Sequence, residues 1–126
     1  MDTNFANLKN EIEKAESIIV LSHFSPDGDT LGSNLALSIV LDKFFNKKVD
    51  SVYVGMLPNT YSYLPSFDKL VDVQTVDKNK VYDLAIAVDV ASKDRMVYGT
   101  VLFDNAKLRA NIDHHKTNIG YGNINI

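Results

Sequence analysis

Three stretches of this sequence place ionisable side chains directly after short apolar runs. They are His23 with Asp27 and Asp29, then Asp89, and finally Asp113 with His114 and His115. The three histidines among them are the only histidines in the chain. Carboxylate and imidazole ligands without thiolates suit Mn²⁺, Fe²⁺, Co²⁺ or a catalytic Zn²⁺. The residue types therefore indicate a metal centre, provided that the fold brings the three groups together.

The number of carboxylates indicates more than one cation. Several carboxylates around one point repel each other, and two divalent cations would offset that charge. Two metals about 3.5–4 Å apart are the usual arrangement for hydrolysing phosphate esters. Each fragment alone also has a structural explanation: Asp-Gly-Asp is a common turn, Asp29 or Thr30 could cap a helix, Asp89 could end a strand, and His-His could lie on the surface. To replace a metal centre, these structural explanations would all have to hold, independently of one another, at three strand ends.

The elements around these residues predict an α/β fold with a mostly parallel sheet and helices on both faces. Helices are expected at residues 2–16, 30–45 and, as a remnant, 101–107; strands are expected at 17–23, 47–55, 69–76, 84–88 and 107–113. In such sheets, ligands bind outside the carboxyl ends of the strands. The three groups follow three of these strands, so we expect them on one edge of the sheet.

The loop before the second helix has the residues of a ligand-binding turn. Gly28 is expected to let the backbone turn so that Asp27 and Asp29 both face inward. The helix beginning near Thr30 would point its positive end at the site and at any anion bound there. Its buried stripe is expected to contain Leu31, Leu35, Ile39 and Phe44.

Composition limits the remaining classes of function. The chain has 126 residues, enough for one domain with a core. Its net charge of −3 argues against a broad nucleic-acid-binding surface, although a pocket could still bind one or two phosphates. Cysteine is absent, the apolar runs are too short to span a membrane, and the N-terminal stretch lacks a signal-peptide core. A cytoplasmic protein without membrane partners is expected.

The motifs resemble those of one known family. "DGDTL" is similar to the aspartate loop of haloacid dehalogenase-like phosphatases, but here the glycine separates the two aspartates and Ser25 and Pro26 separate them from the strand. By contrast, "HFSPDGDTLGS", "AVDVAS" and "NIDHHKTN" together resemble the first three motifs of the DHH phosphoesterase family over nearly the whole chain. They are most similar to the nanoRNase and pAp-phosphatase branch, which is related to RecJ-type exonucleases. The resemblance implies a Rossmann-like DHH domain.

The resemblance also implies a role for each residue of the site. His23 and Asp27 would bind one Mn²⁺, Asp29 and His114 would bind a second, and Asp89 would bridge both. His115 would lie near the scissile phosphate, and Asp113 would orient the neighbouring histidines, so that Asp113, His114 and His115 form the catalytic motif. Arg95 and Lys116 are weaker candidates for phosphate contacts. Two Mn²⁺ ions are expected in the complete enzyme, with Mg²⁺, Co²⁺ or Fe²⁺ as alternatives.

The implied function is hydrolysis of phosphate esters in small nucleotides or short oligonucleotides by a water that two metals activate. A family II-like inorganic pyrophosphatase and a noncatalytic nucleotide- or metal-binding module are the alternatives. Family members continue with a fourth aspartate motif and a C-terminal substrate-binding domain. Residues 1–126 are therefore expected to be the N-terminal part of a DHH catalytic domain with an incomplete sheet. The sequence leaves a homodimer open.

Overall fold

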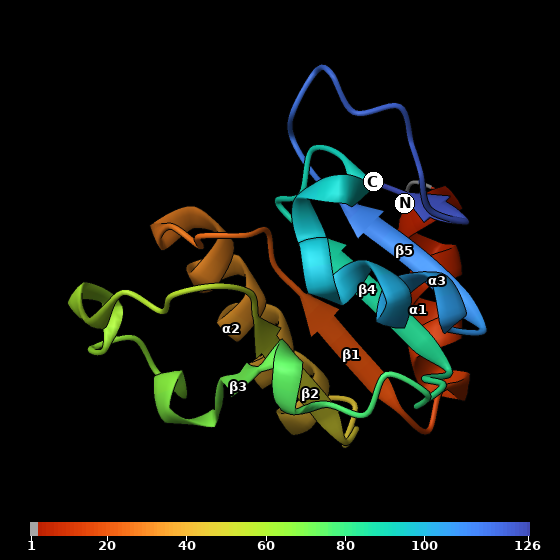
Figure 1. The fold of residues 1–126 in the computed structure, drawn as a ribbon. Coiled ribbons are helices and arrows are strands. Elements are labelled where there is room, and N and C mark those ends of the chain that lie inside the picture. Colours follow the sequence, from red (N-terminus) through yellow and green to blue (C-terminus); the bar gives the residue numbers. More distant parts are fainter. Residues whose placement is uncertain (1–2) are drawn as a thin grey trace.

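Six parallel strands form one sheet at the centre of the structure, a computed structural model that describes residues 3–126. The strand order is β3-β2-β1-β4-β5-β6 (Figure 1). The strands are β1 (Ile18–Leu21), β2 (Val49–Tyr53), β3 (Val71–Asp72), β4 (Leu84–Val88), β5 (Leu108–Ile112) and β6 (Ile124–Asn125). The prediction of an α/β fold with a parallel sheet is thus confirmed.

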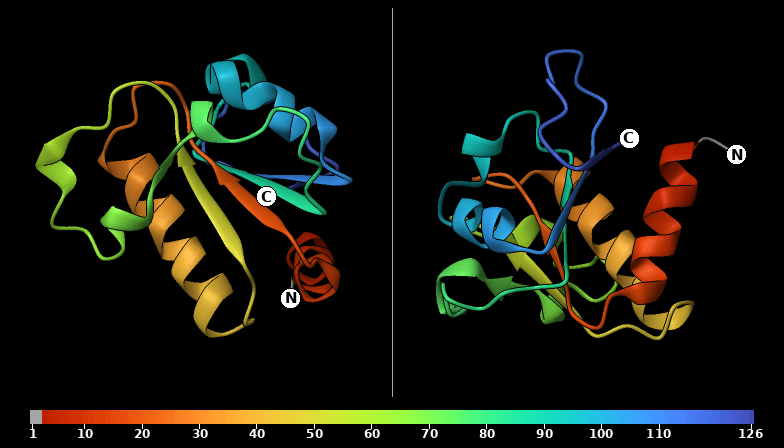
Figure 2. Two further views of the ribbon diagram at one scale, coloured as in Figure 1. Left: turned by 60° about the horizontal axis from the view of Figure 1, so that its bottom comes forward. Right: turned by 90° about the vertical axis from the view of Figure 1, so that its right-hand side faces the viewer.

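Helices cover both faces of the sheet, as the sequence predicts. The α-helices are α1 (Thr3–Lys14), α2 (Gly28–Lys43) and α3 (Thr100–Asn105); the 3₁₀ segments are η1 (Asn59–Tyr61), η2 (Phe67–Lys69), η3 (Val73–Thr75) and η4 (Lys93–Gly99). Figure 2 shows α1 and α2 on one face, with η4 and α3 on the other. Within residues 3–126, no helix has the length and apolar character needed to span a membrane.

A separate apolar core lies on each face. Ile12 of α1 and Leu41 of α2 are buried in one core, and Leu102 and Phe103 of α3 are buried in the other. Strands β1 and β4 contribute alternate side chains to both cores, so every one of their residues is buried. This double burial explains why both strands are continuous apolar runs instead of alternating apolar and polar residues.

Asn34 attaches α2 to the sheet beneath it. Its fully buried side-chain amide donates to the carbonyl oxygens of Val20 and Val52, at 3.3 and 3.2 Å, and to Ser22 Oγ at 2.8 Å. Its own oxygen accepts from Ser38 Oγ. One polar residue thus ties the helix to β1 and β2, which fixes where α2 lies over the sheet.

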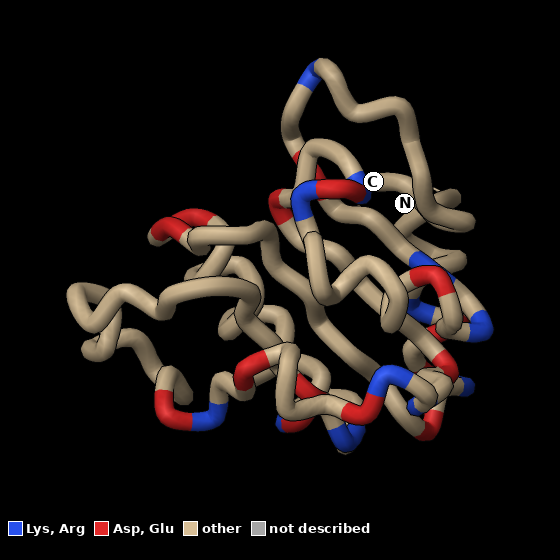
Figure 3. Tube along the Cα trace, in the orientation of Figure 1, with Lys and Arg blue, Asp and Glu red and all other residues tan. Residues whose placement is uncertain are grey.

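The strand order reverses between β1 and β4, and this creates the crevice in which ligands bind in such sheets. The chain leaves β1 toward β2 through α2 on one face, and it leaves β4 toward β5 through η4 and α3 on the other. Several acidic positions lie in the loops at this upper edge (Figure 3). The fold therefore brings the polar strand ends to one place.

Several predicted boundaries and two predicted buried positions differ from the structure. Ile39, predicted in the buried stripe of α2, is only half-buried. The first helix was predicted from residue 2, which lies outside the described residues, and α2 begins at Gly28, two residues before the predicted start. Phe44, predicted in the buried stripe, is 82% exposed because it caps the end of α2 beyond the covered face. Strand β6 was not predicted; it adds to β5 after a loop at 113–123.

Candidate metal centre

The side chains predicted to form a metal centre do converge at the carboxyl edge of the sheet. A cavity of about 310 Å³ opens there. Its lining residues are His23, Asp27, Asp29, Asp89, Ala91, Arg95, His114 and His115. Arg95 comes from η4, whereas Lys116, which is exposed on the 113–123 loop, lies outside the lining residues described for this cavity.

Asp89 lies at the centre of this arrangement. It follows β4 directly, is 8% exposed, and has a backbone φ of 58°. This φ lies in the left-handed region, which residues with a side chain rarely adopt. Burial raises the pKa of its carboxyl, and the nearby negative charge of Asp29 raises it further. Among the described residues, its Oδ1 is a buried atom without a hydrogen-bond partner. His114 Nε2 is only 3.0 Å from that oxygen, but the pair does not meet hydrogen-bond geometry.

Asp27 and Asp29 are held by the start of α2. Asp27 is the N-cap of the helix, and its Oδ1 accepts from the Thr30 backbone N–H at 3.0 Å. This hydrogen bond lowers the pKa of Asp27, so the side chain stays anionic to lower pH. Asp29 stands in the first turn, where the positive end of the helix favours a carboxylate.

Gly28 has a different role from the one predicted. It is the first residue of α2 and is absent from the described residues with positive φ, so the turn does not require glycine for its conformation. Instead, a Cβ at this position would lie 3.0 Å from Cε1 of Tyr61. Glycine therefore allows the Tyr61 ring of η1 to pack against the loop that carries the aspartates. No feature of the sequence near Tyr61 indicated this contact.

Asp113 positions His115. Its side chain is 2% exposed; its Oδ1 lies 2.6 Å from His115 Nδ1, and its Oδ2 accepts from Asn118 Nδ2 at 2.8 Å. Burial alone would raise the pKa of Asp113, but the hydrogen bonds from Asn118 and His115 outweigh it and leave that pKa lowered. The same contact raises the pKa of His115. Asn118 belongs to the motif "DHHKTN", but its role was not predicted.

The ring of His23 is oriented by the backbone. Its Nδ1 lies 2.9 Å from the Phe24 carbonyl oxygen, which assigns the proton to Nδ1 and leaves Nε2 as an acceptor. Nε2 lies 3.7 Å from Asp27 Oδ1. The Phe24 N–H in turn donates to the Arg95 carbonyl oxygen at 2.7 Å, which fixes the segment against η4. In a ligand histidine held in this way, the ring is already oriented before a metal binds to its free nitrogen.

These residues fit a divalent cation. His23, Asp27 and Asp89 form one group with ligand atoms within 4.8 Å of one another, and Asp89, Asp113, His114 and His115 form a second. In the second group both oxygens of Asp113 already have partners, whereas Asp29 Oδ2 lies 3.4 Å from His114 Nε2. A buried carboxylate oxygen without a hydrogen-bond partner is costly unless a cation satisfies it. Asp89, common to both groups, has such an oxygen.

A second cavity adjoins the first. It measures about 400 Å³ and shares Asp29, Asp89 and His114 with the metal centre. Beyond these residues, it continues over apolar side chains that include Leu37, Val88 and Ile112. The three shared residues therefore lie between two cavities, one with a polar lining and one with a largely apolar lining.

Comparison of the sequence with known proteins gives a family match. A model described as the DHH family, N-terminal domain, matches residues 17–125. The chain is 31% identical over 122 residues to a probable bifunctional oligoribonuclease and PAP phosphatase NrnA of Streptococcus mutans, and 31% identical over 109 residues to the bifunctional oligoribonuclease and PAP phosphatase NrnA of Thermus thermophilus. These alignments cover 97% and 86% of this chain, but 37% and 31% of the relatives.

A solved structure supports the fold. The chain superposes on an exopolyphosphatase-related protein from Bacteroides fragilis with a TM-score of 0.87 and 22% sequence identity. The match covers 98% of this chain and 38% of that one. At this identity the likeness concerns the fold alone. In both kinds of comparison, this chain spans between 31% and 38% of the length of the protein it matches.

Proposed function

Because the chain belongs to the DHH family, through the N-terminal domain matched at residues 17–125, we propose that it is a metal-dependent phosphoesterase acting on small nucleotides or short oligonucleotides. The names of the curated relatives support this substrate class. The observation that carries the proposal is Asp89: a buried carboxylate with an unpartnered oxygen that stands in both Asp/His groups. We assign the proposed activity to the site that these Asp and His side chains line.

In this proposal, the side chains divide between two cations. His23 and Asp27 would hold one, Asp29 and His114 would hold the other, and Asp89 would contribute to both. Mn²⁺ suits this mixture of oxygen and imidazole donors, with Co²⁺, Fe²⁺ or Mg²⁺ as alternatives. The support is geometric, since Asp89 is shared by the two groups and His114 Nε2 faces both Asp29 and Asp89.

The remaining residues act on the substrate's phosphate. When bound, two divalent cations activate water and neutralise charge on the phosphoryl oxygens. His115 lines the same cavity, and its Asp113 partner favours the imidazolium, so His115 can donate a proton or a hydrogen bond to a phosphate oxygen. Arg95, from η4, supplies a second positive charge to the same cavity. Lys116 is a weaker candidate for phosphate contact because it lies outside the lining residues described for this cavity.

Parallel hydrolysis assays test the proposal. The protein is incubated with Mn²⁺ and, separately, with the dinucleotide pApA, adenosine 3′,5′-bisphosphate and inorganic pyrophosphate. Release of AMP from either nucleotide, lost in Asp89→Asn, supports the proposed function. Hydrolysis of pyrophosphate alone would instead support the inorganic pyrophosphatase. Binding of nucleotide without turnover of any substrate would indicate a noncatalytic module.

A further inference from the structure

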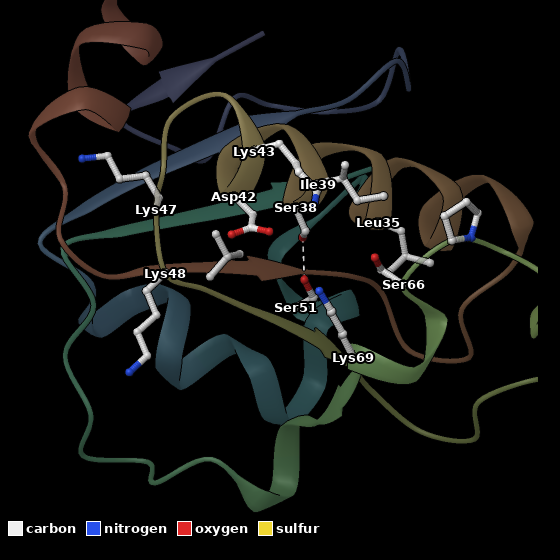
Figure 4. A pocket seen from close by; sticks show the side chains of 12 residues that line it. Leu35, Ser38, Ile39, Asp42, Lys43, Lys47, Lys48, Ser51, Ser66 and Lys69 are labelled. Atoms are coloured by element: carbon white, nitrogen blue, oxygen red, sulfur yellow. Dashed lines mark hydrogen bonds between the residues drawn. The ribbon is translucent and has the colours of Figure 1, made fainter.

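A third cavity, of about 500 Å³, lies between α2, β2 and the segment before η2 (Figure 4). Ser38, which lines this cavity, is nine residues beyond Asp29 on α2. A helix rises ~1.5 Å per residue, so the two positions are roughly 14 Å apart along its axis. Among the described residues, this cavity and the cavity at the metal centre share no lining side chain. Its volume is within the range of small-molecule pockets, roughly 300–1,000 Å³.

The floor of this cavity is a pair of buried hydroxyl groups. Ser38 and Ser51 are 9% and 7% exposed, although both line the cavity. Ser51 Oγ donates to Ser38 Oγ (dashed in Figure 4), which donates to Asn34 Oδ1 at 3.3 Å. Both hydroxyl protons are therefore already used, and the floor offers a ligand oxygen lone pairs. A group that donates a hydrogen bond, such as a hydroxyl or an amine, suits it.

The rim of the cavity is positively charged. Lys43, Lys47, Lys48 and Lys69 line it with one acid, Asp42, in a chain whose net charge is −3. Lys47 Nζ already donates to the Glu13 carbonyl oxygen at 2.8 Å. Lys43, Lys48 and Lys69 are absent from the ion pairs found among residues 3–126. In the view of Figure 4, the side chain of Lys69 extends toward Ser51, and both residues line the same cavity.

Apolar side chains form the walls between floor and rim. Leu35, Ile39, Val49 and Pro65 line the cavity and would contact the uncharged body of a ligand. We propose that this cavity binds a small phosphorylated organic compound, with the phosphate at Lys69 and a neighbouring hydroxyl or amine donating to the serine pair. Lysine is a common phosphate ligand that acts as a point charge. Asp42 repels the phosphate from its own side of the cavity and so favours one orientation.

Amide NMR spectra of the protein, recorded with a chelator so that the metal centre is empty, test this site. The probes are ribose 5-phosphate, ribose and inorganic phosphate. Ribose 5-phosphate should shift the amide signals of Ser38, Ser51 and Lys69 and reach saturation. Ribose and inorganic phosphate each lack one half of the proposed contacts, and each should bind at least about tenfold more weakly, the effect of roughly 1.4 kcal/mol.

Matched variants locate the contacts. Lys69→Met should weaken ribose 5-phosphate binding about tenfold, the size of one charge-assisted hydrogen bond. Lys69→Arg should retain most of the binding, and Lys14→Met, in an exposed lysine of α1, should change nothing. The proposal is overturned by equal affinity in Lys69→Met, by shifts confined to His23 and Asp89, or by the absence of saturable shifts. Signal broadening that follows protein concentration instead of the probe would mark this surface as a contact between proteins, and would overturn it too.

Discussion

Asp89 holds a conformation that is unfavourable without a ligand. Its backbone φ is positive. A non-glycine residue at positive φ costs on the order of 1–3 kcal/mol, and the surrounding structure must sustain it. Its carboxylate is also buried close to Asp29, which raises its pKa. A bound cation removes the electrostatic part of this cost, because it interacts only with the charged form. Asp89 therefore lowers the stability of the metal-free fold, and its conformation favours binding of a cation.

Asp89→Asn is expected to stabilise the metal-free protein at neutral pH. The folded-state pKa of Asp89 is raised. Its charged form therefore destabilises the fold above that pKa, and the effect vanishes below the unfolded value of about 3.9. Thermal unfolding in a chelator should give a higher Tm for the variant near neutral pH, and the difference should shrink as the pH falls. A variant that fails to fold would instead show that Asp89 is a structural residue.

Asp113→Asn is expected to lower the pKa of His115. The carboxylate of Asp113 holds His115 Nδ1–H at 2.6 Å and stabilises the imidazolium, and an amide in its place carries no charge. The stabilisation that this contact gives the metal-free fold is present between about pH 3.9 and pH 6.5. It is lost as the pH rises through the raised folded pKa of His115 or falls through the lowered folded pKa of Asp113. NMR titration of the His115 ring measures the change. Asp94→Asn, in an exposed acid of η4, is the control, and an unchanged His115 titration in Asp113→Asn would contradict the assignment.

At the scale of elements, Asn34 determines where α2 lies. Asn34→Ala removes the buried amide that joins the helix to Val20, Ser22 and Val52, so each of these buried groups loses a hydrogen-bond donor. Each unsatisfied buried group costs about 1–3 kcal/mol, so the free energy of unfolding should fall by at least about 2 kcal/mol. Urea unfolding measures this. Ser33→Ala, on the same helix, should change it by less than about 0.5 kcal/mol, and equal effects of the two variants would be evidence against the anchor.

The sequence predicted the elements with strong patterns and missed those that depend on contacts. Strands β1 and β4 are continuous apolar runs, so both strands could be predicted from the sequence. Because the sheet is parallel, His23, Asp89 and Asp113, which follow strands, were then expected on one edge. Strand β6 has only two residues and exists through pairing with β5, which leaves no periodic signal.

The supporting residues of the site could not be predicted from spacing. Tyr61 reaches the aspartate loop across more than thirty positions of sequence, and its contact depends on the missing Cβ of Gly28. Asn118 acts by joining Asp113 to Asn111 Oδ1 and to the Val90 carbonyl oxygen. Such contacts follow from tertiary structure, whereas the ligand types themselves were visible because carboxylate and imidazole are chemically distinctive.

For the molecule as a whole, the choice of metal follows from the donor set. The chain spans 37% and 31% of the length of two curated relatives that it matches, so we propose the activity for the site to which this chain contributes. Mn²⁺ should support faster hydrolysis of pApA than Mg²⁺, because Mg²⁺ dehydrates reluctantly and oxygen ligands suit it better than imidazole. Rates are compared after chelator treatment and readdition of each ion. Equal or faster turnover with Mg²⁺ would contradict the roles given to His23 and His114.

The central claim is that Asp89 joins the polar strand ends into one metal centre, and Mn²⁺ bound per chain tests it most directly. Electron paramagnetic resonance of free Mn²⁺ gives this quantity for the wild type, Asp89→Asn, His23→Ala and the control Asp68→Asn, an exposed acid of η2. We predict saturable binding in the wild type and the control, a partial loss in His23→Ala, and a loss at both positions in Asp89→Asn with the fold intact. Unchanged Mn²⁺ binding by folded Asp89→Asn would contradict the account.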